Sequence, residues 1–267
     1  MGKGTKYVAK VPDANGTIHY TDDEHQIWHE LITRQKKLLP GRACSEYLRA
    51  LELLELPEDR VPQCADVSRV LREHTGWEVA PVPALINFTD FFNLLASKRF
   101  PAASFIRNRE EMEYLQEPDI FHEIFGHTPL LTDPRFAAFT HAYGKAGAAA
   151  RKEDRSMLAR LYWFTVEFGL IHRPEEALRT YGAGIVSSIG ETVYALHSDD
   201  PQRKPFDPVD VLRTPYRIDI FQPIYFVIES FDTLFEVAQM DLLALIEQAR
   251  KLGMHLPAFP PKEAASA

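Results

Sequence analysis

The stretch PDIFHEIFGH, from Pro118 to His127, constrains the fold of this chain more than any other segment. From Ile120 to His127 it places two imidazoles and the Glu123 carboxylate in an otherwise apolar run. Burying such groups costs free energy unless hydrogen bonds or an opposite charge compensate them, and a divalent metal ion does so directly. We therefore predict a buried metal site around His122 and His127. A pair of hydrogen-bonded histidines without a metal is the alternative.

The two histidines are five residues apart, which distinguishes the segment from a zinc protease helix. In His-Glu-x-x-His the histidines are four apart and share one helical face. At about 100° per residue, five steps along an α-helix turn the second imidazole about 140° away from the first. We therefore predict that Gly126 ends the helix, that Pro129 prevents its continuation, and that His127 binds from the loop beyond.

A third ligand is predicted in the segment LYWFTVEFGLI, where Glu167 is the only charged residue. A segment that is apolar on every side is typical of a buried helix, and a lone carboxylate there requires a cation, a metal ion or a strong donor. Two histidines and one carboxylate form the facial triad of non-haem Fe(II) oxygenases, which leaves coordination positions open for dioxygen. For Glu167, pairing with a buried arginine is the alternative.

Three longer blocks resemble the signatures of the pterin-dependent aromatic amino acid hydroxylases: PDIFHEIFGHTPLL, ARLYWFTVEFGL and YGAGIVSSIGE. The upstream HYTDDEHQIW and IRN agree, and the resemblance extends from about Ile18 to Met254. It implies that His122, His127 and Glu167 bind iron. It also implies a basket of helices around a deep cleft, and a tetrahydropterin, typically tetrahydrobiopterin, as the electron donor to dioxygen.

The resemblance also assigns a pterin pocket. Phe91 matches the family's stacking phenylalanine, and Tyr162 precedes the tryptophan of the third-ligand block. Glu123, beside the first histidine, is the candidate catalytic residue and a polar edge of the pocket. The segment expected to border the same pocket contains Val82, Leu85 and Ile86. From spacing alone, Phe91 and Tyr162 would instead be core residues.

An aromatic amino acid needs a cation for its carboxylate and aromatic side chains for its ring. The resemblance assigns the cation to Arg107, which can make a bidentate contact, and a second carboxylate donor to Ser187. Trp163 and Phe168 resemble the ring-binding residues, and Gly184 would give the substrate close access. Without the resemblance, Arg107 would be interpreted as a solvated surface charge.

The implied activity is hydroxylation of L-phenylalanine to L-tyrosine with dioxygen and a tetrahydropterin at a mononuclear Fe(II) centre. Trp163 favours phenylalanine or tyrosine over tryptophan as the substrate, because tryptophan hydroxylases tend to have a smaller aromatic residue there. A tryptophan hydroxylase is the alternative within the family. Two alternatives lie outside it: a hydrolase with zinc on the same residues and Glu123 as general base, and a non-catalytic protein with a closed metal site.

The composition indicates one globular domain. The 267 residues, 45% of them hydrophobic, can bury a large core, and no linker or repeat divides them. We expect a catalytic domain over residues 18–254, with flexible ends at 1–17 and 255–267. A net charge of -8 with scattered basic residues disfavours nucleic acid, and no segment approaches the roughly 20 apolar residues of a membrane span. We expect a cytoplasmic protein, a monomer or a dimer, with a small-molecule substrate. Cys44 and Cys64 are expected to be reduced, and a disulfide between them is the alternative.

The secondary structure is expected to be mainly α with a small β element, an α+β fold. Thr21 and Glu24 form a capping box that opens a helix through about Lys37. Further helices are predicted at 44–54, 65–75, 89–97, 119–126, 134–150, 156–172, 174–181, 190–197 and 231–252. Extended segments are predicted at 77–79, 103–107 and 216–220.

Overall fold

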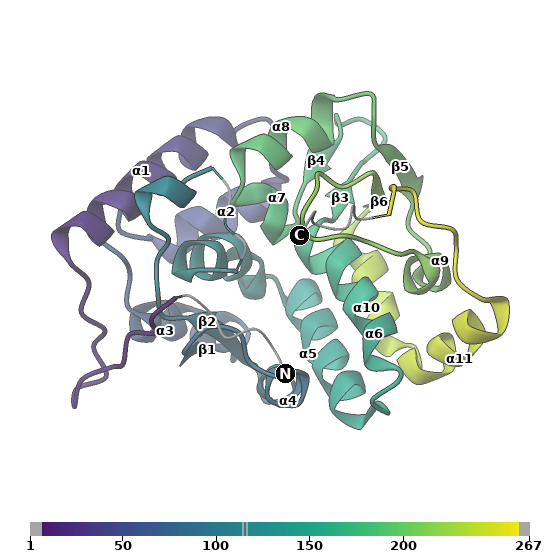
Figure 1. The fold of residues 1–267 in the computed structure, drawn as a ribbon, viewed down its shortest axis with the longest axis horizontal. Coiled ribbons are helices and arrows are strands. Elements are labelled where there is room, and N and C mark those ends of the chain that lie inside the picture. Colours follow the sequence, from purple (N-terminus) through teal and green to yellow (C-terminus); the bar gives the residue numbers. More distant parts are fainter. Residues whose placement is uncertain (1–6, 114, 116, 262–267) are drawn as a thin grey trace, which may run out of the picture.

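Helices form most of the structure, and two small sheets lie among them (Figure 1). The computed structural model describes residues 7–113, 115 and 117–261. The α-helices are α1 (Asp22–Leu38), α2 (Ser45–Leu54), α3 (Cys64–His74), α4 (Phe88–Ala96), α5 (Pro134–Ala149), α6 (Arg155–Tyr162), α7 (Ala183–Val186), α8 (Ile189–His197), α9 (Pro208–Arg213), α10 (Phe231–Gln239) and α11 (Leu242–Leu252). The predicted fold class is confirmed.

The two sheets flank the segments that carry the predicted ligands. In the first sheet, β1 (Glu78–Val82) pairs in parallel with β2 (Arg99–Ala103), and α4 connects them. The second has the order β4-β3-β6-β5. Its strands are β3 (Leu170–Ile171), β4 (Arg179–Thr180), β5 (Gln202–Pro205) and β6 (Ile224–Ile228). Because β3 begins three residues after Glu167, the second sheet fixes the chain directly beyond that carboxylate.

Helix α1 packs against the segment that carries the first predicted metal ligand. The Glu24 backbone N–H donates to Thr21 Oγ1 over 3.3 Å, and the Thr21 N–H donates to the Glu24 carboxylate over 2.7 Å, so the predicted capping box is confirmed. The helix buries Trp28, whose ring lies edge-on to Phe121 with 5.5 Å between ring centroids. Phe121 directly precedes His122, so this contact positions the first predicted ligand.

Three predicted helices differ from the structure. The helix predicted at 156–172 is too long, because helical turns end at Glu167 and Leu170–Ile171 form strand β3. The helix predicted at 174–181 is wrong, because Arg179 and Thr180 pair with β3 as strand β4, and this tertiary pairing overrides the local helical preference. The helix predicted at 231–252 is two helices, because α11 starts afresh after Asp241. The Asp241 carboxylate accepts hydrogen bonds from the N–H groups of Leu243 and Ala244 and so caps it.

The extended segments were predicted less well than the helices. The short strand predicted at 77–79 overlaps β1, but the strand predicted at 216–220 is wrong, since the strand of that region is β6 at Ile224–Ile228. The strand predicted at 103–107 meets β2 only at Ala103. Aromatic and β-branched residues occur in loops as well as strands here, so composition did not locate the ladders.

The two cysteine thiols lie in the protein interior. Cys44 and Cys64 are both buried and free, and burial raises the pKa of each thiol to about 12. Such thiols are unreactive at neutral pH.

Within residues 7–113, 115 and 117–261, none of the helices combines the length and apolar character that a bilayer crossing requires. The mobility of the chain ends stays a prediction.

Candidate metal centre

His122 and His127 both lie in η2 (His122–His127), which is a turn of π-helix. In a π-helix the backbone hydrogen bond joins residues five apart, so these two positions follow each other along one face. The imidazoles therefore project together, and their Nε2 atoms are 3.0 Å apart. The prediction that Gly126 ends the helix is wrong, because the wider turn accommodates the five-residue spacing.

Gly126 serves close packing instead. A Cβ atom at this position would lie 3.0 Å from the carbonyl oxygen of Ala183, at the start of α7. The close approach of α7 brings Ser187 Oγ to 2.9 Å from His122 Nδ1. Because the Ser187 hydroxyl donates to the Ala183 carbonyl over 2.7 Å, its oxygen accepts from His122 Nδ1–H. The lone pair of His122 is thereby left on Nε2, toward His127.

Glu167 ends a second π-helical turn, η4 (Trp163–Glu167), which continues directly from α6. Its carboxylate oxygens are 3.2 Å from His127 Nε2 and 3.5 Å from His122 Nε2. Two ligand atoms about 2.1 Å from a metal and at right angles lie about 3.0 Å apart. The two imidazoles and this carboxylate therefore have the separations of three ligands on one face of a metal ion.

Threonines stabilise both π turns. Such turns disturb the α-helical hydrogen-bond ladder, so carbonyl groups near them need other donors. The Thr128 hydroxyl donates to the Ile124 carbonyl over 2.6 Å, and the Thr165 hydroxyl donates to the Leu161 carbonyl over 2.5 Å. Tyr47 from α2 also donates to the backbone of η2 over 2.6 Å. The two segments that present the ligands are thus fixed by the same device.

Glu123 lies at the edge of this cluster. Its carboxylate and the two histidines offer ligand atoms within 4.8 Å of one another, so it could also approach a metal. Its nearest oxygen is 3.8 Å from His127 Nε2, however, whereas the Glu167 oxygens are 3.2 and 3.5 Å from the Nε2 atoms of His127 and His122. The shorter distances make Glu167 the better third ligand and leave Glu123 beside the site.

The two carboxylates differ in their electrostatics. Burial alone would raise the pKa of Glu167, but His127 and His122 outweigh burial and hold that pKa well below its usual range. Burial raises the pKa of Glu123 to about 8; His122 opposes this rise, and Glu167 adds to it. The environment thus favours an anion at Glu167 and a neutral acid at Glu123. Such a divergence between neighbouring acids is typical of functional sites.

Arg107 is buried, with only 6% of its surface exposed, so its interpretation as a solvated surface charge is wrong. Its Nε and Nη2 atoms donate to Asp119 over 2.8 and 3.0 Å. Asp119 is fully buried and also accepts from the His122 backbone N–H over 3.0 Å. Our sequence reasoning missed Asp119, although an aspartate three residues before a helical residue is an N-cap pattern.

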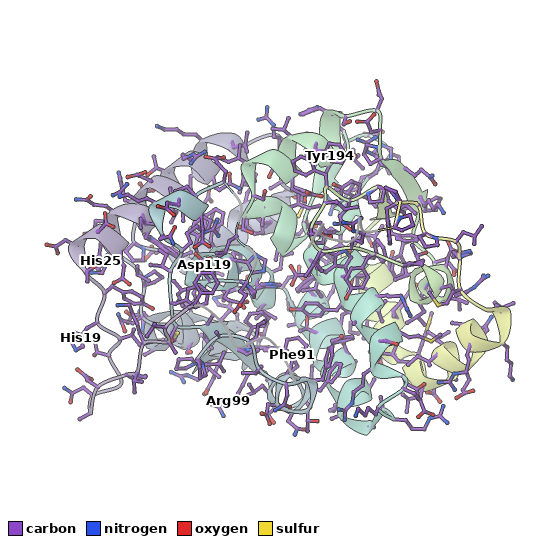
Figure 2. The ribbon with its side chains drawn as sticks, viewed as in Figure 1. His19, His25, Phe91, Arg99, Asp119 and Tyr194 are labelled. Carbon is purple, nitrogen blue, oxygen red and sulfur yellow. The ribbon has the colours of Figure 1, made fainter. Side chains whose placement is uncertain are left out.

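The predicted pterin residues lie on converging elements. Phe91 of α4 meets Tyr162 of α6 edge-on with 5.4 Å between ring centroids, and Tyr162 lies 6.1 Å from the His127 ring. Figure 2 shows Phe91 on α4 and Asp119 on the segment that leads into η2. The end of β1 contributes the partly buried Val82, and the connection from β1 to α4 contributes the partly buried Ile86 and the exposed Leu85.

The predicted substrate residues also cluster. Trp163 and Phe168 have ring centroids 4.4 Å apart, and a Cβ atom on Gly184 would lie 2.8 Å from the Phe168 ring. Tyr216, which the sequence analysis missed, stacks on Trp163 at 4.5 Å. Tyr216 comes from a loop distant in sequence, so no local pattern indicated it. Arg107 and Ser187 approach the centre through Asp119 and His122 respectively.

This geometry belongs to the class of mononuclear non-haem metal sites, in which two imidazoles and one carboxylate face a single ion. A family model described as biopterin-dependent aromatic amino acid hydroxylase matches residues 5–247. The chain belongs to this family.

Individual relatives belong to the same family. A phenylalanine-4-hydroxylase of Pseudomonas aeruginosa is 59% identical over 263 residues, which cover 98% of this chain and 100% of the relative. The apo structure of the cold-active phenylalanine hydroxylase from Colwellia psychrerythraea 34H is 56% identical, with a TM-score of 0.94, and the match covers 97% of this chain and 100% of that one. A Chromobacterium violaceum phenylalanine hydroxylase structure with bound oxidised Fe(III) has 45% identity and a TM-score of 0.87, with 94% and 91% covered.

We expect Ser187→Ala to weaken metal binding by about 10- to 100-fold, because His122 Nδ1 loses its hydrogen-bond acceptor and the imidazole is less well oriented. Competition with a chelator for Fe(II) measures the affinity. Ser188→Ala is the matched control, because Ser188 caps α8 through the Glu191 N–H. Equal affinities for the two variants would contradict this role of Ser187.

Proposed function

We propose that this chain hydroxylates L-phenylalanine to L-tyrosine, with dioxygen and a tetrahydropterin as co-substrates at a mononuclear Fe(II) centre. The observation that carries the proposal is the trio of ligand atoms of His122, His127 and Glu167, which are separated by 3.0 to 3.5 Å in a chain of this family. The name of the 59% identical relative favours phenylalanine over the tryptophan alternative.

His122, His127 and Glu167 are the proposed iron ligands. Two neutral imidazoles and one carboxylate leave the ion with net positive charge and open positions. When bound, the iron supplies dioxygen activation with electrons from the pterin. The protein's own contribution is orientation: Ser187 keeps the His122 lone pair on Nε2, and Asp119 holds the backbone N–H of His122.

The proposed pterin site lies between α4 and α6. Phe91 offers an aromatic face for stacking, and Tyr162, which meets Phe91 edge-on, borders the pocket beside it. Glu123 is the proposed catalytic group, a buried acid that can exchange hydrogen bonds with the polar edge of the pterin. The remaining wall consists of Val82, Leu85 and Ile86. The exposure of Leu85, 67%, supports a mouth at this end.

The proposed substrate site uses Arg107 for the amino acid carboxylate. Its two hydrogen bonds to Asp119 fix the guanidinium, and further N–H groups on Nη1 and Nη2 remain to bind the substrate carboxylate. Ser187 is a second proposed donor to that carboxylate, for which its single hydroxyl hydrogen would turn away from the Ala183 carbonyl. Trp163 and Phe168 are proposed to hold the ring, and Gly184 leaves the space beside Phe168 that a side chain would fill.

Turnover assays test the proposal. The protein is supplied with Fe(II), a tetrahydropterin, dioxygen and equal amounts of phenylalanine, tyrosine and tryptophan. We expect tyrosine formation from phenylalanine to dominate, with oxygen uptake that depends on the pterin. Preferred hydroxylation of tryptophan would refute the substrate, and zinc-dependent hydrolysis without oxygen would refute the class.

We further propose that the protein works as a monomer in the cytoplasm. Its two buried, free cysteines are compatible with a reducing compartment. Its exposed large apolar side chains come from many separate segments, which suits a chain without an extensive apolar interface. Light scattering after size exclusion tests the monomer, and a mass of twice 30.5 kDa would contradict it.

A further inference from the structure

The indole of Trp163 has a hydrogen-bond partner outside its own segment. Its Nε1 donates to Gln222 Oε1 over 2.9 Å. Gln222 is buried, with 1% of its surface exposed, and its Nε2 donates to the carbonyls of Arg217 and Ile220 over 2.9 and 3.0 Å. Because these carbonyls satisfy both amide hydrogens, the amide oxygen must face Trp163. The orientation of the amide is therefore determined by its own loop.

A second buried group fixes Gln222. Its backbone N–H donates to Glu191 Oε1 over 3.2 Å, and the Tyr225 hydroxyl donates to the same oxygen. Glu191 comes from α8, and Tyr225 is fully buried in β6. The loop before β6 is thereby tied to a helix and to the sheet. A continuous chain of hydrogen bonds runs from Glu191 through Gln222 to Trp163.

The hydrogen bond adds a constraint that the other contacts of Trp163 do not provide. Phe168 and Tyr216 lie 4.4 and 4.5 Å from the indole, and the Tyr216 ring is within 17° of parallel to it. Stacking of this kind resists tilting, but it permits a ring to slide or rotate in its own plane. The hydrogen bond to Gln222 is directional and fixes the edge of the indole.

We propose that Gln222 is a positioning residue for Trp163, held in turn by Glu191, and that it sets the size of the aromatic-ring pocket and so the preference for phenylalanine over a larger ring. This inference rests on the proposed function, in which Trp163 contacts the substrate ring. Without Gln222 the indole occupies several positions. Phenylalanine then binds less well, and the bulkier tryptophan is excluded less well.

Gln222→Met tests the proposal, because methionine has a similar length and no amide. We expect KM for phenylalanine to rise about three- to tenfold, the range of one lost hydrogen bond, with a smaller change in kcat. The ratio of tryptophan to phenylalanine turnover should rise as well. Gln222→Asn keeps an amide but is too short to reach Trp163, so it should show the same changes in KM and selectivity. It replaces Gln222→Met in the experiment if that variant folds poorly. Unchanged KM and selectivity in a folded variant would overturn the proposal.

A double-mutant cycle separates positioning from a merely structural role. Trp163→Phe removes the indole N–H, so adding Gln222→Met should then raise KM no further. If Gln222→Met raises KM by the same factor in both backgrounds, the proposal is overturned. Phe221→Leu is the control in the same loop, because Phe221 stacks on Tyr194 and is half-exposed. It should leave KM and selectivity unchanged.

Fluorescence gives a readout besides activity. Trp28 and Trp77 are fully buried, so acrylamide quenching reports chiefly on the partly buried Trp163. We expect Gln222→Met to increase quenching, whereas unchanged quenching would count against a freed indole. The two proposals can be refuted separately. Wild-type protein that forms no tyrosine would refute the proposed hydroxylase function. Active wild-type protein together with Gln222 variants of unchanged KM and selectivity would refute only the role of Gln222.

Discussion

Glu167→Ala should retain no stoichiometric iron and lose about a thousandfold or more in tyrosine formation. Among the residues that the structure describes, the substitution removes the only carboxylate whose oxygens lie within 3.5 Å of both imidazole Nε2 atoms. A catalytic metal supplies several kcal/mol of stabilisation to a reaction, and about 4 kcal/mol corresponds to a thousandfold in rate. Iron content after gel filtration and tyrosine production under saturating pterin measure the two losses.

Glu123→Gln is the matched control for this experiment, because it changes the other buried carboxylate of the site. Glu123 lies 3.8 Å from His127 Nε2, beyond the Glu167 distances, so its variant should keep iron while it alters pterin binding. If Glu167→Ala kept its iron and Glu123→Gln lost it, the third ligand would have to be reassigned.

The second large effect concerns stability. Asp119→Ala should lower the free energy of unfolding by about 3–5 kcal/mol, because it leaves the buried Arg107 guanidinium without its partner. It also removes the acceptor of the His122 N–H. Urea unfolding at neutral pH measures the change. Asp23→Ala, which breaks an exposed pair with Arg109, should have little effect, and equal losses for the two variants would contradict the argument.

The same pair predicts a pH dependence. Burial alone would raise the pKa of Asp119, but Arg107 outweighs burial and holds that pKa below its usual value. A carboxyl group with a depressed pKa in the folded state stabilises the protein above its unfolded pKa of about 3.9, and this stabilisation is lost as the pH falls below it. The free energy of unfolding of Asp119→Ala should therefore depend less on pH in the acid range than that of the wild type.

The clustering of His122, His127 and Glu167 could be predicted from sequence because each is a titratable side chain in an apolar run, a pattern with few physical explanations. The geometry that unites His122 and His127 could not. Five-residue spacing is compatible with a helix that ends between them and with a π turn, and local sequence does not separate the two solutions. The packing of α7 on Gly126 and the hydrogen bonds of Thr128 and Tyr47 indicate why the wider turn is stable here.

Residues that support the ligands were harder to predict. Asp119 could have been found from its N-cap position, but Tyr216 and Gln222 reach Trp163 from a loop more than fifty residues away in sequence. Their proximity depends on how β6 is added to the second sheet, which is a long-range pairing. The segment predicted as a helix at 174–181 failed for the same reason, since its pairing with β3 overrides its local preference.

The paired π turns limit how this centre can be engineered. If the same residues of η2 formed an ordinary α-helix, five steps of about 100° would turn His127 about 140° away from His122. The two imidazoles would then no longer face one ion, although all three ligand residues were still present in the sequence. A designer who transfers the triad to another helical scaffold must therefore transfer both turns, together with the threonines that stabilise them.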